Sequence, residues 1–194
     1  MSYGNHQHTA TRMRLFTGID LPADVTLRLD QLLARLRPAA PLKWSPPQNL
    51  HITTKFIGEW PAERLEELTS ALRALPRREP FPIEVRGLGW FPNPHHPRVF
   101  WAGVHGDGLE RLARDTEEAL AALGIPRESR PFAPHLTLAR IKEPVPLAAL
   151  RREVASLDSD RFGAFRAERF HLYESRLTPS GSVYTKLFEF PFVP

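Results

Sequence analysis

The sequence predicts an α+β protein with mainly antiparallel sheets, built from two pseudo-symmetric lobes that share one cleft. Three observations lead to this fold class. Four stretches carry apolar residues at helical spacing, and about seven to nine shorter stretches are strand-like. One segment recurs 84 residues further along the chain. Near the C-terminus, two alternating stretches flank a short turn, which is typical of a β-hairpin.

The first half of the chain is expected to form two strands, two helices and a short extended piece. Val25, Leu29 and Leu36 mark an apolar helical stripe, and Pro38 ends that helix. Gly58 closes the second strand. In order, the expected elements are a strand at residues 14–21, a helix at 22–36, an extended piece at 42–44, a strand at 49–59 and a helix at 62–75.

The second half repeats this alternation and adds the hairpin. Asp107 and Glu110 have the spacing of a capping box and start a helix that Gly124 ends. Residues 178–181 (Thr-Pro-Ser-Gly) form the expected hairpin turn. In order, the elements are a strand from residue 81 toward 90, a strand at 98–105, a helix at 107–123, a strand at 133–143, a helix at 147–157 and two long strands at 162–177 and 182–192.

Length and composition indicate one domain. Residues 1–12 are polar and aperiodic and are expected to be a disordered extension or an artefact of the assigned start site, so that residues 13–194 form a single domain of two interleaved lobes. No run approaches 18 apolar residues and no basic-then-apolar leader is present, so we expect a cytoplasmic protein without membrane contact. The absence of cysteine excludes disulfides, thiolate metal sites and a cysteine nucleophile.

The charge balance is basic. The chain has a formal net charge of +4, and 22 of its 26 basic residues are Arg. Arg recognises phosphate through paired hydrogen bonds, so an anionic partner such as RNA fits this composition. A bias toward Arg also arises from genome composition, and the charge alone leaves both explanations open.

A paired motif is the main functional signal. Residues 49–59 and 133–143 are two copies of one strand-like segment. At the same offset, Arg-Leu-Phe at residues 14–16 aligns with Arg-Val-Phe at 98–100, so the repeating unit is strand, helix and motif strand. Within the two segments, four pairs of identical residues align: His51 with His135, Thr53 with Thr137, Ile57 with Ile141 and Glu59 with Glu143.

The residue types of the motif suit chemistry at phosphorus. Alternation along a strand puts each His on the same face as the Thr two residues later. If the copies face each other, two imidazoles and two hydroxyls meet in one cleft. One imidazole can then deprotonate an attacking water while the other protonates the leaving oxygen, and the hydroxyls can bind phosphoryl oxygens. A lone strand His is more often structural, but the repeated surroundings favour a functional pair.

The same residues resemble a known family. Residues 14–16, 44–59, 98–104 and 130–140 are similar to the bacterial RNA 2′,3′-cyclic phosphodiesterases of the two-histidine phosphoesterase superfamily, first described as 2′-5′ RNA ligases. The resemblance spans the chain from about residue 13 and implies two sheets that line a central cleft, with helices outside. It implies hydrolysis of RNA 2′,3′-cyclic phosphate ends to 2′-phosphomonoesters, with no metal or other cofactor. Ligation would follow when a 5′-hydroxyl attacks in place of water.

The resemblance also implies a role for each motif residue. His51 would be the proton donor to the leaving ribose oxygen and His135 the proton acceptor from water, while Thr53 and Thr137 orient the phosphate. The two motifs by themselves are too alike to separate acid from base. Arg140 matches the family's Arg after the second motif and would neutralise phosphate charge. Strict alternation places Arg140 on the face opposite His135, so this role requires a bulge or a strand end.

Aromatic residues at the rim of the cleft are expected to stack on a terminal base. Phe132 is the first candidate, and Phe56, Trp44, Phe91 and Trp101 follow. Most aromatic residues in such folds lie in the core, so core packing is the alternative for each.

Three other functions stay open. One is a phosphodiesterase for small nucleotides, such as a cyclic ADP-ribose phosphate or a 2′-5′ oligoadenylate, and another is an RNA-binding module whose His pair only contacts phosphate. A metallohydrolase with His51 and His135 as ligands is disfavoured, because neither motif carries a carboxylate neighbour or a helical His pair. His95 and His96, flanked by prolines, are expected to be solvated. The expected partner is RNA with a 2′,3′-cyclic phosphate end, and the expected oligomeric state is a monomer.

Overall fold

The computed structural model describes residues 10–194; residues 1–9, and with them most of the expected extension, lie outside the described residues. The four predicted helices are all present, with ends at most three residues from the expected ones. In chain order the elements are β1 (Arg12–Ile19), α1 (Ala23–Leu36), η1 (Arg37–Ala39), β2 (Lys43–Trp44), η2 (Pro47–Asn49), β3 (Ile52–Pro61), η3 (Ala62–Arg64), α2 (Leu65–Arg73), β4 (Phe81–Phe91), β5 (Val99–His105), α3 (Asp107–Ala121), β6 (His135–Arg140), α4 (Ala148–Ala155), β7 (Arg161–Ala167), β8 (Arg169–Thr178) and β9 (Gly181–Pro191).

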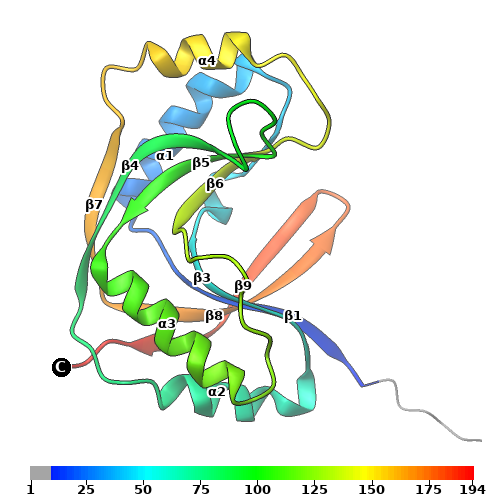
Figure 1. Ribbon diagram of the computed structural model, residues 1–194, viewed down its shortest axis with the longest axis vertical. Coiled ribbons are helices and arrows are strands. Elements are labelled where there is room, and N and C mark those ends of the chain that lie inside the picture. The colour runs from blue at the N-terminus through cyan, green and yellow to red at the C-terminus, as the bar shows by residue number, and fades with distance from the viewer. Residues whose placement is uncertain (1–9) are drawn as a thin grey trace, which may run out of the picture.

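The strands form two sheets, and every pair within them is antiparallel. One sheet has four strands in the order β3-β1-β8-β9, and the other has five in the order β2-β6-β5-β4-β7. The motif strands β3 and β6 belong to different sheets and contact each other across the middle of the molecule (Figure 1). This arrangement confirms the predicted α+β fold with mainly antiparallel sheets.

The helices cover the sheets crosswise. Helix α1, which follows β1 of the four-stranded sheet, contacts β7 of the five-stranded sheet. Helix α3, which connects β5 and β6, contacts β3 of the four-stranded sheet. In Figure 1, α1 lies beside α4 at one end and α3 beside α2 at the other. Each of these two helices therefore covers the sheet to which the strand before it does not belong, which interleaves the two lobes.

The prediction of one long strand at residues 162–177 is wrong. The chain forms two strands there: β7 at the edge of the five-stranded sheet and β8 in the four-stranded sheet. The break falls at Glu168, whose carbonyl accepts a hydrogen bond from the amide of Phe192 (2.8 Å). Alternating apolar residues continue through the break, because both strands bury one face, and alternation cannot show that the chain changes sheets. The crossing at Glu168 joins the two lobes.

Two smaller boundaries also differ from the predictions. Strand β1 begins at Arg12, one residue before the expected start of the domain, and the extension itself stays a prediction. Strand β3 begins at Ile52, so His51 lies directly before its motif strand and not within it. His135 is the first residue of β6. Both imidazoles are thus carried where a loop enters a strand.

The two copies of the repeat pair their strands in the same way, but the alignment of β1 with β5 made from the sequence is shifted by one residue. Phe16 pairs with Phe56, whereas Arg140, which is 84 residues beyond Phe56, pairs with Val99. Phe16 therefore corresponds to Val99, and its alignment with Phe100 was wrong by one residue. The two aligned phenylalanines lie on opposite faces of their sheets. Phe16 packs against His51, and Phe100 is completely buried in the core.

Candidate active site

Each motif imidazole is held by the same hydrogen bond. Nδ1 of His51 lies 2.7 Å from the carbonyl oxygen of Asn49, and Nδ1 of His135 lies 2.8 Å from that of Ala133. A carbonyl oxygen only accepts, so Nδ1 carries the proton in both rings. The neutral form of each ring consequently has its lone pair on Nε2. This is the nitrogen that can take up or release a proton toward a substrate.

The environment of His51 is aromatic and more enclosed. Its ring lies 4.7 Å from the ring of Phe16 and 5.0 Å, edge on, from that of Tyr184 (centroid distances). The ring of Tyr173 stacks on that of Phe16 at a centroid distance of 4.9 Å. Nε2 of His51 is 2.9 Å from Oγ1 of Thr53. In the neutral ring, the Thr53 hydroxyl is the donor of this bond.

His135 stands in a different environment. Its ring meets the edge of Phe91 at a centroid distance of 5.0 Å. Thr137 lies opposite Trp101 of β5, and its carbonyl accepts a hydrogen bond from the hydroxyl of Ser45 (2.7 Å). The indole nitrogen of Trp101 is buried and has no hydrogen-bond partner among residues 10–194. The Phe91 and Trp101 rings thus form the wall beside the second motif.

The electrostatics indicate that both imidazoles occupy one site. Burial is the main cause that lowers the pKa of His51, and the positive charges of His135 and Arg140 lower it further. Burial likewise lowers the pKa of His135, again with Arg140 acting in the same direction. The carbonyls that accept from Nδ1 raise both pKa values in part. His51 and the two β6 residues come from opposite sheets, and the direct contact between β3 and β6 brings them together.

A bulge in each motif strand decides which later residue faces the cleft. The pairing of β1 with β3 skips Thr54, and the pairing of β5 with β6 skips Leu138, 84 residues further on. An extra residue reverses the alternation of faces. Arg140 therefore lies on the side of His135, by the bulge that its predicted role required. Phe56, at the corresponding position of the first lobe, lies on the side of His51 and is 53% exposed.

The structure separates the aromatic candidates for base stacking. Phe132 is 37% exposed in the loop that leads into β6, so it and Phe56 are available to a ligand. Trp44 is a packing residue, since its indole donates to the carbonyl of Ala40 and its ring meets Phe100 edge on. Phe91 packs on His135 and Trp101 on Phe91. Stacking by Phe132 and Phe56 stays a prediction.

Sequence reasoning missed the residues that surround His51. Phe16, Tyr173 and Tyr184 were not candidates, although they form its wall. The two tyrosines lie on the hairpin strands β8 and β9, far from either motif in sequence. Their signal was the alternation of that hairpin, which places both tyrosines on the sheet face that carries Phe16.

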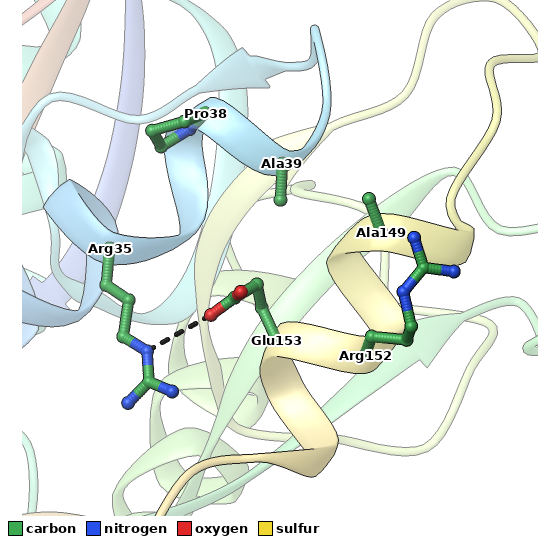
Figure 2. A pocket seen from close by; sticks show the side chains of 6 residues that line it. All are labelled: Arg35, Pro38, Ala39, Ala149, Arg152 and Glu153. Atoms are coloured by element: carbon green, nitrogen blue, oxygen red, sulfur yellow. Dashed lines mark hydrogen bonds and ion pairs between the residues drawn. The ribbon is translucent and has the colours of Figure 1, made fainter.

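Other concave and polar features lie away from the motifs. Figure 2 shows a shallow pocket between η1 and α4, in which Arg35 and Glu153 form an exposed ion pair of 3.2 Å. Across residues 10–194, no three His, Cys, Asp or Glu side chains are grouped as metal ligands would be. The helices of the described part are too short or too polar to cross a membrane.

Comparison with known proteins agrees with this architecture. Two His-x-Thr motifs in a bilobal α+β fold define the class of two-histidine phosphoesterases. The family model described as LigT like Phosphoesterase matches residues 19–101 and 104–184, one segment in each half of the chain. The chain belongs to the LigT-like phosphoesterase family.

Relatives and solved structures cover almost the whole chain. It is 38% identical to the RNA 2′,3′-cyclic phosphodiesterase of Archaeoglobus fulgidus, over 90% of this chain and 98% of that protein. It is 39% identical to the protein of the same name from Thermus thermophilus, over 92% and 89%. The crystal structure of TT0787 of Thermus thermophilus superposes with a TM-score of 0.79 at 36% identity, over 93% and 98%. LigT of E. coli complexed with 3′-AMP gives 0.74 at 26% identity, over 95% and 100%.

Proposed function

We propose that the protein is an RNA 2′,3′-cyclic phosphodiesterase that opens the cyclic phosphate to a 2′-phosphomonoester by acid-base catalysis with His51 and His135. The observation that carries the proposal is the matched pair of imidazoles, each with Nδ1 bonded to a carbonyl, so that Nε2 is the nitrogen that exchanges a proton. Family membership supports the reaction, since the relatives that cover this chain bear the name of that activity. RNA is the proposed partner.

The reaction needs two proton transfers on opposite sides of phosphorus. Nε2 of His135 takes a proton from water as the water oxygen bonds to phosphorus. The bond from phosphorus to O3′ breaks, and Nε2–H of His51 delivers a proton to O3′, which leaves the 2′-phosphate. Both pKa values are lowered by burial from about 6.5, which keeps a neutral base available near neutral pH.

The remaining groups stabilise the charge that develops on the phosphoryl oxygens. Thr53 and Thr137 lie beside the imidazoles and can donate hydroxyl hydrogen bonds to those oxygens. Arg140 supplies a permanent positive charge on the same side of β6 as His135. When a 5′-hydroxyl replaces water as the nucleophile, the same groups form a 2′-5′ linkage, which accounts for a ligase activity.

The test is hydrolysis of an oligoribonucleotide that ends in a 2′,3′-cyclic phosphate, in the presence of a chelator. Chromatography would follow the product and show whether the phosphate is on O2′ or O3′. We expect the 2′-phosphate, with the rate reduced at least about 10²-fold in His51→Ala and in His135→Ala. His96→Ala, in an exposed loop, is the matched control and should retain the activity. Turnover that is indifferent to both motif histidines would contradict the mechanism.

A second candidate substrate class has support from the solved relatives. LigT of E. coli has been crystallised with NADP+ and with ATP, at 28% and 27% identity to this chain. A small-nucleotide phosphodiesterase would use the same site. Competition between the oligoribonucleotide and a mononucleoside 2′,3′-cyclic phosphate separates the two: a clear preference in kcat/KM for the oligonucleotide supports RNA, and the opposite preference supports the small nucleotide.

A further inference from the structure

One charged residue breaks the symmetry between the two histidines. The last pair of strands β1 and β3 is Ile19 with Ile52, so the next position places Asp20 opposite His51. At the corresponding position of the other lobe, Gly103 is opposite His135. His51 thus has a carboxylate beside it where His135 has a hydrogen atom.

The orientation of the Asp20 carboxylate is fixed by two bonds. Oδ1 accepts from the amide of Leu21 (2.9 Å), and Oδ2 accepts from the ammonium group of Lys186 on β9. The negative charge of Asp20 acts on three titratable side chains that line this sheet, His51, His171 and Tyr173. Asp20 is therefore the charge shared by the enclosed polar groups on the His51 side of the cleft.

The other lobe has no room for an equivalent carboxylate. A Cβ atom on Gly103 would lie 2.5 Å from the carbonyl oxygen of Arg86, which belongs to the neighbouring strand β4. That contact is with backbone, and any side chain there would require a shift of β4. The charged group that acts on His135 is Arg140, which disfavours a protonated imidazole.

We propose that Asp20 is a positioning residue that keeps the proton on His51, and so makes His51 the acid and His135 the base. The inference rests on the proposed function, since it assigns the roles within that reaction. It accounts for a division of labour that the two nearly identical motifs leave open. The titratable and charged groups around His51 are Asp20 from the β1–α1 connection, His135 and Arg140 from β6, His171 and Tyr173 from β8, and Tyr184 and Lys186 from β9.

NMR titration of the imidazole resonances tests the proposal without turnover. His51→Gln and His135→Gln assign the two signals, and the titrations are run on wild type, Asp20→Asn and Lys186→Met. In wild type His51 should titrate at higher pH than His135. Asp20→Asn should move the His51 midpoint to lower pH and leave that of His135 in place. Lys186→Met should move the His51 midpoint the opposite way, because the carboxylate loses its counter-charge.

The opposite directions of the two variants separate an electrostatic role from structural damage. Glu189→Gln is the matched control: Glu189 acts on His171 and pairs with Arg169, so neither motif midpoint should change. An unchanged His51 midpoint in Asp20→Asn, equal displacement of both histidines, or a wild-type order with His135 higher would overturn the proposal.

Kinetics supply a second readout. The alkaline limb of the pH profile reports loss of the acid's proton, so Asp20→Asn should move that limb to lower pH, with the acidic limb and KM unchanged. The rate on the alkaline side should fall about three- to tenfold. An unmoved alkaline limb in an active Asp20→Asn enzyme would overturn the assignment. Failure of the proposed function would look different, as the wild type itself would not open the cyclic phosphate.

Discussion

The two motif strands β3 and β6 share what holds an imidazole and differ in what surrounds it. Both place the Nδ1 of a histidine on the carbonyl two residues earlier, and both carry a bulge after the motif threonine. At the next residue that faces the cleft, one strand presents Phe56 and the other Arg140. In the proposed reaction the repeat supplies two proton carriers held in the same way, and their different neighbours give them different roles.

The residues that pair with the two motif threonines also differ between the sheets. Opposite Thr53 is Gly18, where a Cβ atom would lie 2.8 Å from the carbonyl oxygen of Ile52, whereas Trp101 fills the position opposite Thr137. Displacement at phosphorus needs a protonated group and an unprotonated one at the same moment. Two identical environments would give each histidine the same proton affinity. In the proposed reaction, the different neighbours of the two histidines would meet this requirement.

The largest expected effect comes from removing both imidazoles. The acid and the base act in one step, so loss of either should cost about 10²–10⁴-fold in kcat. In the double variant His51→Ala/His135→Ala the rate should be little lower than in the worse single variant, because groups that act as a unit are not additive. Single-turnover hydrolysis of the cyclic phosphate would measure this. Independent, multiplying losses would indicate that the two histidines do not share a transition state.

Arg140 and Phe56 face the cleft after the two bulges, and we expect substitution of either residue to impair catalysis or binding. Arg140→Phe removes the fixed charge near phosphorus and should lower kcat about 10–10²-fold. Phe56→Ala should mainly raise KM, since its predicted role is to stack on the terminal base of the ligand. The variant Phe56→Arg/Arg140→Phe tests whether the position of the positive charge matters or only its presence in the cleft. We expect this variant to remain impaired. Full recovery of kcat in the exchange would show that a positive charge anywhere in the cleft suffices. Steady-state kinetics with the oligoribonucleotide measure each effect.

The sequence predicted the elements well where apolar spacing and chain-breaking residues coincide. The helices were correct because proline or glycine bounds each apolar stripe. Residues 162–177 were misread, since alternation reports a buried face and not which sheet provides it. The wrong alignment of Phe16 with Phe100 has a related cause. It was made from identical residue types, which do not show how each strand pairs with its neighbour.

The candidate site could be predicted only in part for similar reasons. The repeat identified both histidines, and the need for a bulge before Arg140 followed from counting faces. Asp20 ends an apolar run and has no motif of its own, so only cross-strand register reveals what it faces. Tyr173 and Tyr184 come close to His51 through long-range pairing that no local pattern encodes.

The core faces of the two motif strands also differ, and this difference should appear in stability. Lys55 is buried in β3, where its ammonium group donates to Glu117 (2.9 Å) and to the carbonyl of Pro126 (2.8 Å); its counterpart in β6 is Ala139. Lys55→Met should lower the free energy of unfolding by about 1–3 kcal/mol, because two partly buried acceptors lose their donor. Urea unfolding measures this, with exposed Lys142→Met as the control expected within about 0.5 kcal/mol of wild type. Equal stability of both variants would show that Lys55 adds nothing beyond its hydrocarbon chain.

The smallest expected effect is the response of stability to pH, and it belongs mainly to the four-stranded sheet. Burial lowers the pKa values of His51, His135 and His171, two of which lie in or beside that sheet. Unfolded histidine titrates near about 6.5, so below this pH the unfolded chain binds more protons than the folded one. Stability should thus be constant above about pH 6.5 and decline as the pH falls toward the lowered folded pKa values.

Urea midpoints at pH 7.5, 6 and 5 would record that decline, in a range where most carboxylates stay ionised. His171→Gln should have a smaller difference between pH 7.5 and pH 5 than the wild type, because one of the three imidazoles with a lowered pKa no longer titrates. His105→Gln, an exposed residue of β5, should keep the wild-type difference. A wild-type midpoint that rises on acidification would mean that protonated histidines gain partners in the folded state, and that burial does not dominate their pKa values.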